Sequence, residues 1–212
     1  DPDCVSVRAA APLDQARLNA TFTAIAGDRG HVAAHNGCGA VMGSKGVKVI
    51  VLDDTGTVTR APKDPEKFKK ANKEFTDGLK KHNVTGQALP AYGTNVLTNI
   101  LNEAGGYPTY NFKDGQFAGA AKISGETEAA LETERGGLAT HGCHRGCVIR
   151  CSGTYHDKDG HYLTKQPEYE TVWAHGAQCG IDDMDKIAMM DFLEDNIGLD
   201  TIETGVTVGV AM

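Results

Sequence analysis

The chain of 212 residues carries 21 Lys and Arg against 28 Asp and Glu, a formal net charge of -7. Its length fits one or two globular domains, because domains usually hold about 100–200 residues. The acidic balance disfavours nucleic acid as the main partner, since phosphate binding depends on clustered Lys and Arg. No apolar run approaches the ~20 residues that a membrane span needs, so no membrane partner is expected.

Cysteine usage indicates a reducing environment. Six cysteines in a chain of this length do not form a disulfide framework, which is typical of much smaller and Cys-denser chains. No basic segment followed by an apolar stretch is visible at the N-terminus, so we expect a cytoplasmic protein. The sequence begins without Met and ends in the apolar stretch Val206 to Met212, which we interpret as an internal segment of a longer protein.

The first quarter of the chain contains a glycine-rich passage. A helix-compatible segment, Leu13 to Ala26, precedes it, and a β-branched strand, Val47 to Leu52, follows it. The passage from His35 to Lys45 lacks the Gly-Lys-Ser of a phosphate loop, and a dinucleotide fingerprint would need the strand before the glycines. Two alternatives remain equal: glycines that let the backbone approach a ligand, or a plain turn.

The pattern after residue 53 is mainly helical. Pro62 and Pro65 favour a helix through about Lys81, with Asp64 as its N-cap. The segment Val84 to Pro90 is expected to be a connector. Apolar residues at helical spacing predict the next helix over Thr94 to Ala104.

The second half alternates loops and helices. Tyr107 to Phe112 is expected to be an aromatic loop, and the alternating acids of Gly125 to Leu138 indicate an exposed helix. Tyr155 to Gly160 is typical of a hairpin turn. Asp182-Asp183 is expected to cap a later helix, which Gly198 ends.

Three cysteines are clustered in the middle of the second half. Cys143, Cys147 and Cys151 fall within nine residues. Thiolates are soft ligands, and such a triplet can deliver three sulfurs to one centre. Steps of four residues would also place three thiols on one face of a core helix. Gly142 and Gly146 disfavour a regular helix, so a metal or iron–sulfur site is the favoured interpretation.

Two aspartates flank the turn at Gly198. Asp200 begins a capping box with Glu203, which gives it a structural role. Asp195 lies in the last turn of the preceding helix, where a carboxylate opposes the macrodipole. Asp195 and Asp200 therefore either present paired acceptors to a ligand rich in N–H donors or serve the fold alone, and the residues do not decide between these.

Taken together, five motifs resemble the aldehyde ferredoxin oxidoreductase family, whose members carry tungsten or molybdenum, two pterin dithiolenes and one [4Fe–4S] cluster. The motifs are Gly39-Ala-Val-Met-Gly-Ser-Lys45, the cysteine cluster, Glu168-Tyr-Glu-Thr171, Cys179-Gly-Ile-Asp-Asp183 and Asp195-Asn-Ile-Gly-Leu-Asp-Thr201. The resemblance runs through nearly the whole chain but covers only the middle of the usual protein. It implies an α+β, mainly α-helical fold. Residues 1–53 would end an N-terminal β pterin-binding domain, and residues 54–212 would form a truncated helical region with the iron–sulfur and pterin motifs.

The resemblance also implies roles for individual residues. Glu170 matches the glutamate beside the metal and would be the general base. The cluster ligands would be Cys143, Cys147 and Cys151. One pterin-holding turn would comprise Asp195, Gly198, Leu199 and Asp200. The passage over the pterins would include His35, Asn36 and Gly37.

The chain departs from the family at two places. The family usually spaces its first two cluster cysteines as Cys-x-x-Cys, whereas three residues separate Cys143 from Cys147 and His144 occupies the usual first position. Either the loop bulges by one residue, which we favour, or His144 replaces a thiolate. The family commonly carries Arg where this chain has His35. A fourth cluster cysteine and a second pterin turn would lie C-terminal to Met212.

The resemblance implies oxidation of a small aldehyde to a carboxylic acid. Electrons would pass through the tungsten (or molybdenum) bis-molybdopterin and the [4Fe–4S] cluster to ferredoxin or another carrier, and a homodimer is allowed. One alternative is a reductive family member similar to the benzoyl-coenzyme A reductase catalytic subunit. Another is a non-catalytic fragment that binds zinc through the three clustered cysteines and Cys179. His141 and His175 are expected to be structural.

Overall fold

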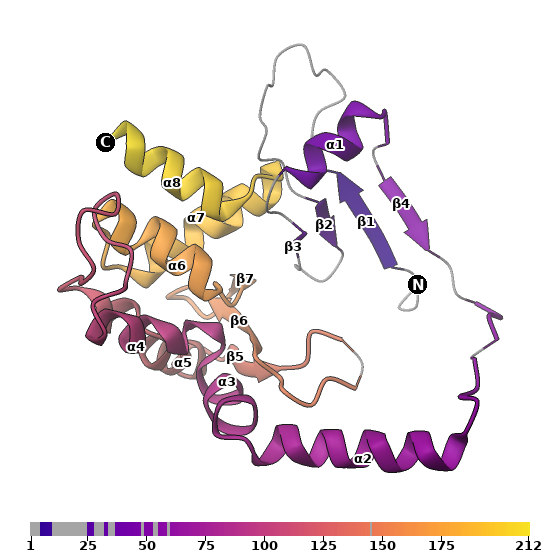
Figure 1. Cartoon of the computed structure of the whole chain (residues 1–212). Coiled ribbons are helices and arrows are strands. Elements are labelled where there is room, and N and C mark those ends of the chain that lie inside the picture. Colours follow the sequence, from indigo (N-terminus) through magenta and orange to yellow (C-terminus); the bar gives the residue numbers. More distant parts are fainter. Residues whose placement is uncertain are drawn as a thin grey trace.

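In its described residues, the computed structural model is mainly helical with two small antiparallel sheets (Figure 1). No helix in the described part is both long and apolar enough to cross a membrane. The predicted helix over residues 13–26 is wrong at its end, because Ile25–Gly27 forms a strand. Its earlier residues, like His35 and Asn36, lie outside the described residues. The structure describes residues 5–9, 25–27, 32–33, 37–47, 49–52, 55–58, 60–144 and 146–212.

The N-terminal sheet has four strands in the order β3-β2-β1-β4, and all neighbours are antiparallel. The predicted strand before residue 53 is present as β4. Whether this sheet ends a pterin-binding domain stays a prediction. The strands are β1 (Val5–Ala9), β2 (Ile25–Gly27), β3 (Val32–Ala33) and β4 (Val49–Leu52).

The glycine-rich passage contains a short helix, α1 (Cys38–Ser44), so the expectation of a plain turn there is wrong. Gly37 precedes the helix with φ of 69°, a conformation that favours glycine. Propensity alone did not predict this helix, because Gly39 and Gly43 are poor helix formers and Gly39 is buried.

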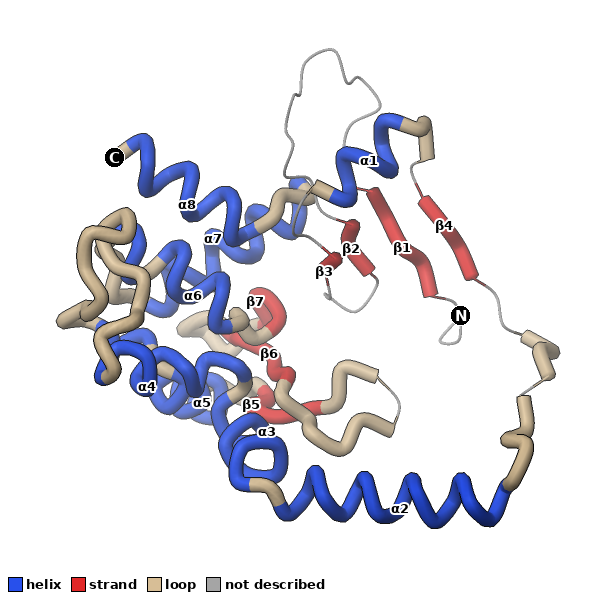
Figure 2. The backbone as a smooth tube through the Cα atoms, in the orientation of Figure 1, coloured by secondary structure: helices blue, strands red, loops and turns tan. Residues whose placement is uncertain are grey.

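Helix α2 (Pro65–Lys81) begins where predicted. Asp64 Oδ1 accepts a hydrogen bond from the backbone N–H of Lys67 at 3.0 Å. None of its 17 described residues is buried. In Figure 2 it runs as a single helix between the N-terminal sheet and the other helices.

Residues 84–92 are helical, so the predicted connector is wrong. A π-helical turn, η2 (Val84–Ala88), continues into α3 (Leu89–Tyr92). The next predicted helix is present as a 3₁₀ turn, η3 (Thr94–Val96), followed by α4 (Leu97–Glu103).

Helix α5 (Gly125–Glu134) follows the 3₁₀ turn η4 (Ala120–Ile123) and is not an exposed helix. Glu128 and Glu132 are both 0% exposed, because they lie one turn apart on the face that packs against the core. The prediction failed because acidic residues are almost never fully buried without partners, and their partners are distant in sequence.

The second sheet has the order β5-β6-β7 and is antiparallel throughout. Its strands are β5 (Leu138–His141), β6 (Ser152–His156) and β7 (Tyr162–Lys165). The predicted hairpin turn joins β6 to β7, where the N–H of Asp157 donates to the carbonyl of His161 at 2.9 Å. The cysteine triplet lies in the loop between β5 and β6, so the core-helix alternative is wrong.

Three helices and a short turn complete the chain: α6 (Tyr169–His175), the 3₁₀ turn η5 (Ala177–Cys179), α7 (Met184–Ile197) and α8 (Thr201–Ala211). The hydrophobic core lies where these elements meet α5, β6 and the aromatic loop. Its fully buried members include Tyr107, Ile123, Tyr155, Val172 and Ile187.

Candidate active site

The loop between β5 and β6 brings soft ligands together. One ligand atom from each of Cys143, His144 and Cys147 lies within 4.8 Å of the other two. The two residues that compete for the first ligand position, Cys143 and His144, are therefore both in this group. Cys151 lies at the end of the loop and does not belong to this group of three ligand atoms. Two thiols and an imidazole that converge in a loop fit a soft metal or an iron–sulfur cluster.

Local hydrogen bonds favour the thiolate form at Cys147. The backbone N–H of Arg150 donates to its Sγ at 3.4 Å, and this contact lowers the pKa of the Cys147 thiol. Burial instead raises the pKa of Cys151. The Cys147 thiol therefore ionises more readily than the Cys151 thiol.

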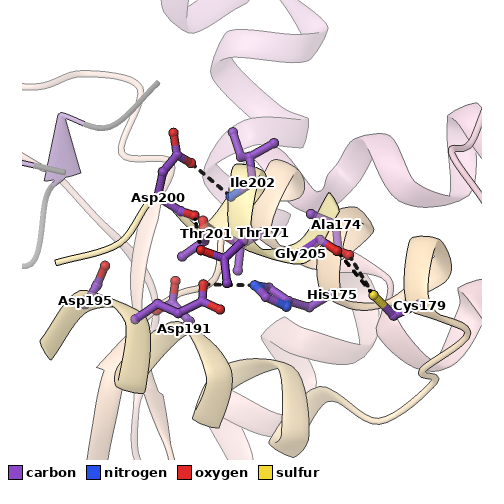
Figure 3. Close-up of polar contacts among 12 residues, drawn as sticks. Thr171, Ala174, His175, Cys179, Asp191, Asp195, Asp200, Thr201, Ile202 and Gly205 are labelled. Atoms are coloured by element: carbon purple, nitrogen blue, oxygen red, sulfur yellow. Dashed lines mark hydrogen bonds and ion pairs between the residues drawn. The ribbon is translucent and has the colours of Figure 1, made fainter. Parts of the chain in front are cut away.

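Cys179 belongs to a different place in the fold. Its Sγ donates weakly to the carbonyls of Ala174 at 3.4 Å and Gly205 at 3.5 Å, between α6 and α8 (Figure 3). It behaves as a small buried hydrophobe. The four-sulfur zinc site considered above is therefore not formed by the described residues.

The turn between α7 and α8 is built as a helix C-cap. Gly198 has φ of 75°, and the N–H groups of Gly198 and Leu199 both donate to the carbonyl of Glu194, at 2.7 and 2.9 Å. Asp200 Oδ1 accepts from the N–H of Ile202 at 3.0 Å and caps α8 (Figure 3). The structural role predicted for Asp200 is confirmed.

Helix α6 supports this turn. Thr171 Oγ1 lies 2.8 Å from Thr201 Oγ1, and the buried His175 Nε2 lies 3.0 Å from Glu194 Oε2. A Cβ on Gly205 would come within 2.7 Å of the Ala174 backbone, so α6 and α8 pack at close range. In Figure 3, Thr171 and Thr201 lie next to each other, and the ring of His175 points toward α7, which carries its partner Glu194.

Asp195 lies beside the turn, and one of its carboxylate oxygens accepts no hydrogen bond from the described residues. Its Oδ2 accepts from Lys165 Nζ at 2.5 Å, whereas its Oδ1 is buried and has no hydrogen-bond partner among the described residues. Burial raises the pKa of Asp195 to about 6. A buried acceptor without a donor is costly, so this oxygen fits a ligand with N–H groups, such as a pterin.

Glu170, the predicted base, is exposed in the first turn of α6. Its neighbour Glu168 is more enclosed and accepts a hydrogen bond from Thr94 Oγ1. Burial raises the pKa of Glu168. Sequence reasoning gave no role to Glu168 or Lys165, because the partners of both side chains lie far away in the chain.

One sheet connects the two motifs. Cys151 directly precedes β6, β6 pairs with β7 through Thr154 and Lys165, and Lys165 reaches the helix that carries Asp195. Two cavities in the described part lie elsewhere. One is lined by residues that include Arg135 and Gly160, and the other by residues that include Tyr110 and Gln178.

Comparisons with known proteins agree with the motifs. The family model described as "Aldehyde ferredoxin oxidoreductase, domains 2 & 3" matches residues 70–212. The chain is 41% identical over 192 residues to the tungsten-containing aldehyde ferredoxin oxidoreductase of Pyrococcus furiosus, and 41% identical over 191 residues to that of Thermococcus kodakarensis. The WOR-like subunit of an aliphatic sulfonate oxidoreductase of Pyrococcus furiosus is 27% identical over 194 residues.

Each match covers 90% of this chain and 30% of the relative, so the chain spans about 30% of the length of the curated relatives that it matches. The matched length and identity leave the relationship clear. The chain belongs to the aldehyde ferredoxin oxidoreductase family.

Proposed function

We propose that the full-length protein oxidises an aldehyde to a carboxylic acid. The balanced reaction consumes one aldehyde and one water and yields one acid, two protons and two electrons. The electrons would leave through a tungsten (or molybdenum) bis-pterin centre and a [4Fe–4S] cluster to ferredoxin, one at a time. The names of the 41% identical relatives support the aldehyde, the tungsten and the ferredoxin.

The observation that carries the proposal is the unfilled acceptor at Asp195. An oxygen buried in this way, next to a turn built by Gly198 and Asp200, fits a ligand edge rich in N–H donors. The soft-ligand loop around Cys147 lies on the same three-stranded sheet that positions Lys165 against Asp195. A site for electron transfer and a site for pterin binding would thus share one scaffold.

Each group of residues would have its own task. Cys143, Cys147 and Cys151 would hold the cluster, and the residues from Asp195 to Asp200 would hold one pterin. Residues 1–53, including His35, Asn36 and Gly37, would complete the pterin-binding β domain, and residues 54–212 the helical region. The metal centre, when bound, supplies the two-electron acceptance that no side chain can provide.

Glu170 is our candidate for the general base. Its exposed position at the start of α6 leaves the carboxylate free to approach water or substrate. Thr94 fixes this helix start, because its Oγ1 accepts from the N–H of Tyr169 at 2.9 Å and donates to Glu168. Glu168 would remain a support for the helix start rather than the base.

The test is an assay of the full-length protein prepared without oxygen. Aldehyde-dependent reduction of a viologen dye is expected, and it should be lost in Glu170→Gln but kept in Glu168→Gln. A parallel assay with aromatic thioesters and a strong reductant tests the reductive alternative. Turnover of thioesters without any aldehyde oxidation would contradict the proposal.

A further inference from the structure

Lys165 is an enclosed ammonium group that contacts two carboxylates of α7. Its Nζ lies 2.9 Å from each oxygen of Asp191 and 2.5 Å from Oδ2 of Asp195. These three contacts match the three N–H donors of a lysine ammonium. Lys165 therefore has no donor left for a ligand, and any effect on a ligand must pass through the aspartates.

The two aspartates differ in what they have left to offer. Asp191 is fully buried and uses both oxygens, since its Oδ2 also accepts from Thr164 Oγ1 at 2.7 Å. Asp195 uses only Oδ2, and its buried Oδ1 has no partner among the described residues. Asp191 thus anchors the ammonium, while Asp195 keeps one oriented acceptor free. Figure 3 shows both side chains on neighbouring turns of α7.

The backbone holds Lys165 rigidly. It is the last residue of β7 and pairs with Thr154 of β6, and the N–H of the next residue, Gln166, donates to the carbonyl of Gly153 at 3.0 Å. The strand β6 begins directly after Cys151. The backbone of Lys165 is therefore paired with the strand that leaves the cysteine loop.

We propose that Lys165 is a positioning residue that holds the Asp195 carboxylate so that Oδ1 accepts an N–H donor of the pterin. This inference rests on the proposed function, because it assumes that a pterin occupies the turn. It adds a residue that does not touch the cofactor and that no motif of the family resemblance included.

The charges around Asp195 give the inference a pH signature. Burial raises the pKa of Asp195 to about 6, Lys165 is the first group that opposes this rise, and Asp191 adds to it. Without the ammonium, the pKa would rise further, so a larger share of the carboxyl would be neutral at pH 7. The described titratable groups that face Asp195 or its direct neighbours are Lys165 and Tyr162 on β7, Glu168 just after this strand, Asp191 and Glu194 on α7, Glu128 on α5, His175 on α6 and Asp200 at α8.

The experiment compares cofactor retention in variants of the full-length protein. Tungsten and pterin per chain are measured after gel filtration at pH 7 and at pH 9 in wild type, Lys165→Met, Lys165→Arg and Asp195→Asn. Lys158→Met is the matched control, because Lys158 is an exposed lysine of the same hairpin. Circular dichroism on each variant checks folding.

We expect Lys165→Met to retain at least tenfold less cofactor than wild type at pH 7 and to regain part of it at pH 9, where Asp195 ionises. Lys165→Arg should keep more than half, because the positive charge remains. Asp195→Asn should be poor at both pH values, and Lys158→Met should match wild type.

Three outcomes would overturn the inference. Wild-type retention in Lys165→Met would remove the positioning role while leaving the proposed function intact. Equal loss at both pH values, with Lys165→Arg as poor as Lys165→Met, would reduce Lys165 to a structural role. A wild-type protein free of tungsten and pterin would reject the proposed function itself, and this inference with it.

Discussion

The cysteine loop of residues 142–151 and the buried polar framework around the α7–α8 turn are built by opposite means. The framework comprises Glu128, Glu132, Lys165, His175, Asp191 and Glu194. In the loop, Cys143 and Cys147 are only partly buried, and their ligand atoms converge. In the framework, ion pairs join β7 and α6 to α7, and a hydrogen bond joins α5 to Asn95 of η3. The difference indicates that the protein preorganises the turn, whereas a bound metal would have to complete the loop.

The largest expected effect is on metal binding by the loop. Cys147→Ser should lower bound iron in the full-length protein at least tenfold, because a hydroxyl is a poor ligand for a soft centre. Cys179→Ser is the control and should keep its iron, since Cys179 is packed between α6 and α8. Iron per chain after anaerobic purification measures both. Equal iron loss in the two variants would contradict the proposed difference between the cysteine loop and the framework.

A substitution in the framework should instead lower the stability of the protein. Asp191→Leu would leave the Lys165 ammonium with Asp195 alone in a buried place, and we expect a loss of roughly 3–5 kcal/mol. Hydrogen–deuterium exchange of α7 and β7 in the full-length protein measures the local opening free energy. A loss below about 1 kcal/mol would show that the framework is less rigid than its contacts indicate.

The buried acids of α5 predict a pH dependence. Burial raises the pKa of Glu132 to about 9, above its ordinary value of 4.5. A carboxyl whose pKa is higher in the folded state than in the unfolded state stabilises the fold most at low pH. The free energy of unfolding should therefore fall by roughly 1.4 kcal/mol per pH unit as pH rises from about 5 to 9. Glu132→Gln should flatten this slope in denaturant midpoints taken from pH 5 to 9. An unchanged slope would assign the effect to another group.

Glycine packing provides the smallest effect. Gly205→Ala places a Cβ within 2.7 Å of the Ala174 backbone and should cost about 1–3 kcal/mol. Gly78→Ala is its control, because a Cβ there meets nothing within 4 Å and the exposed helix should gain up to about 1 kcal/mol. Thermal unfolding of both variants gives the comparison. A neutral Gly205→Ala would mean that α6 and α8 can separate freely.

Local sequence signals predicted an element correctly wherever that element depends on residues close to it in the sequence. The Asp64 cap, the turn at Gly198 and the β6–β7 hairpin are set by residues within a few positions, and each is present as predicted. The family resemblance, carried by short motifs, is confirmed by the match over residues 70–212. The roles of Glu170 and of the cluster cysteines stay predictions.

Contacts between residues far apart in the sequence could not be predicted from local patterns. Helix α5 looked exposed because the partners that its acids Glu128 and Glu132 contact, Asn95 and Gln166, lie 33 and 34 residues away. Lys165 looked like any lysine, and only the register of β7 brings it to Asp191 and Asp195. The helical segment at residues 84–92 was missed because Gly86 and Pro90 are poor helix formers.

The most direct test is elemental and pterin analysis of the full-length protein purified without oxygen. The account predicts pterin and a constant molar ratio of tungsten or molybdenum to protein chain. It also predicts about four iron atoms per chain, which correspond to one [4Fe–4S] cluster. Zinc in proportion to chain, with neither iron nor tungsten nor molybdenum, would contradict it.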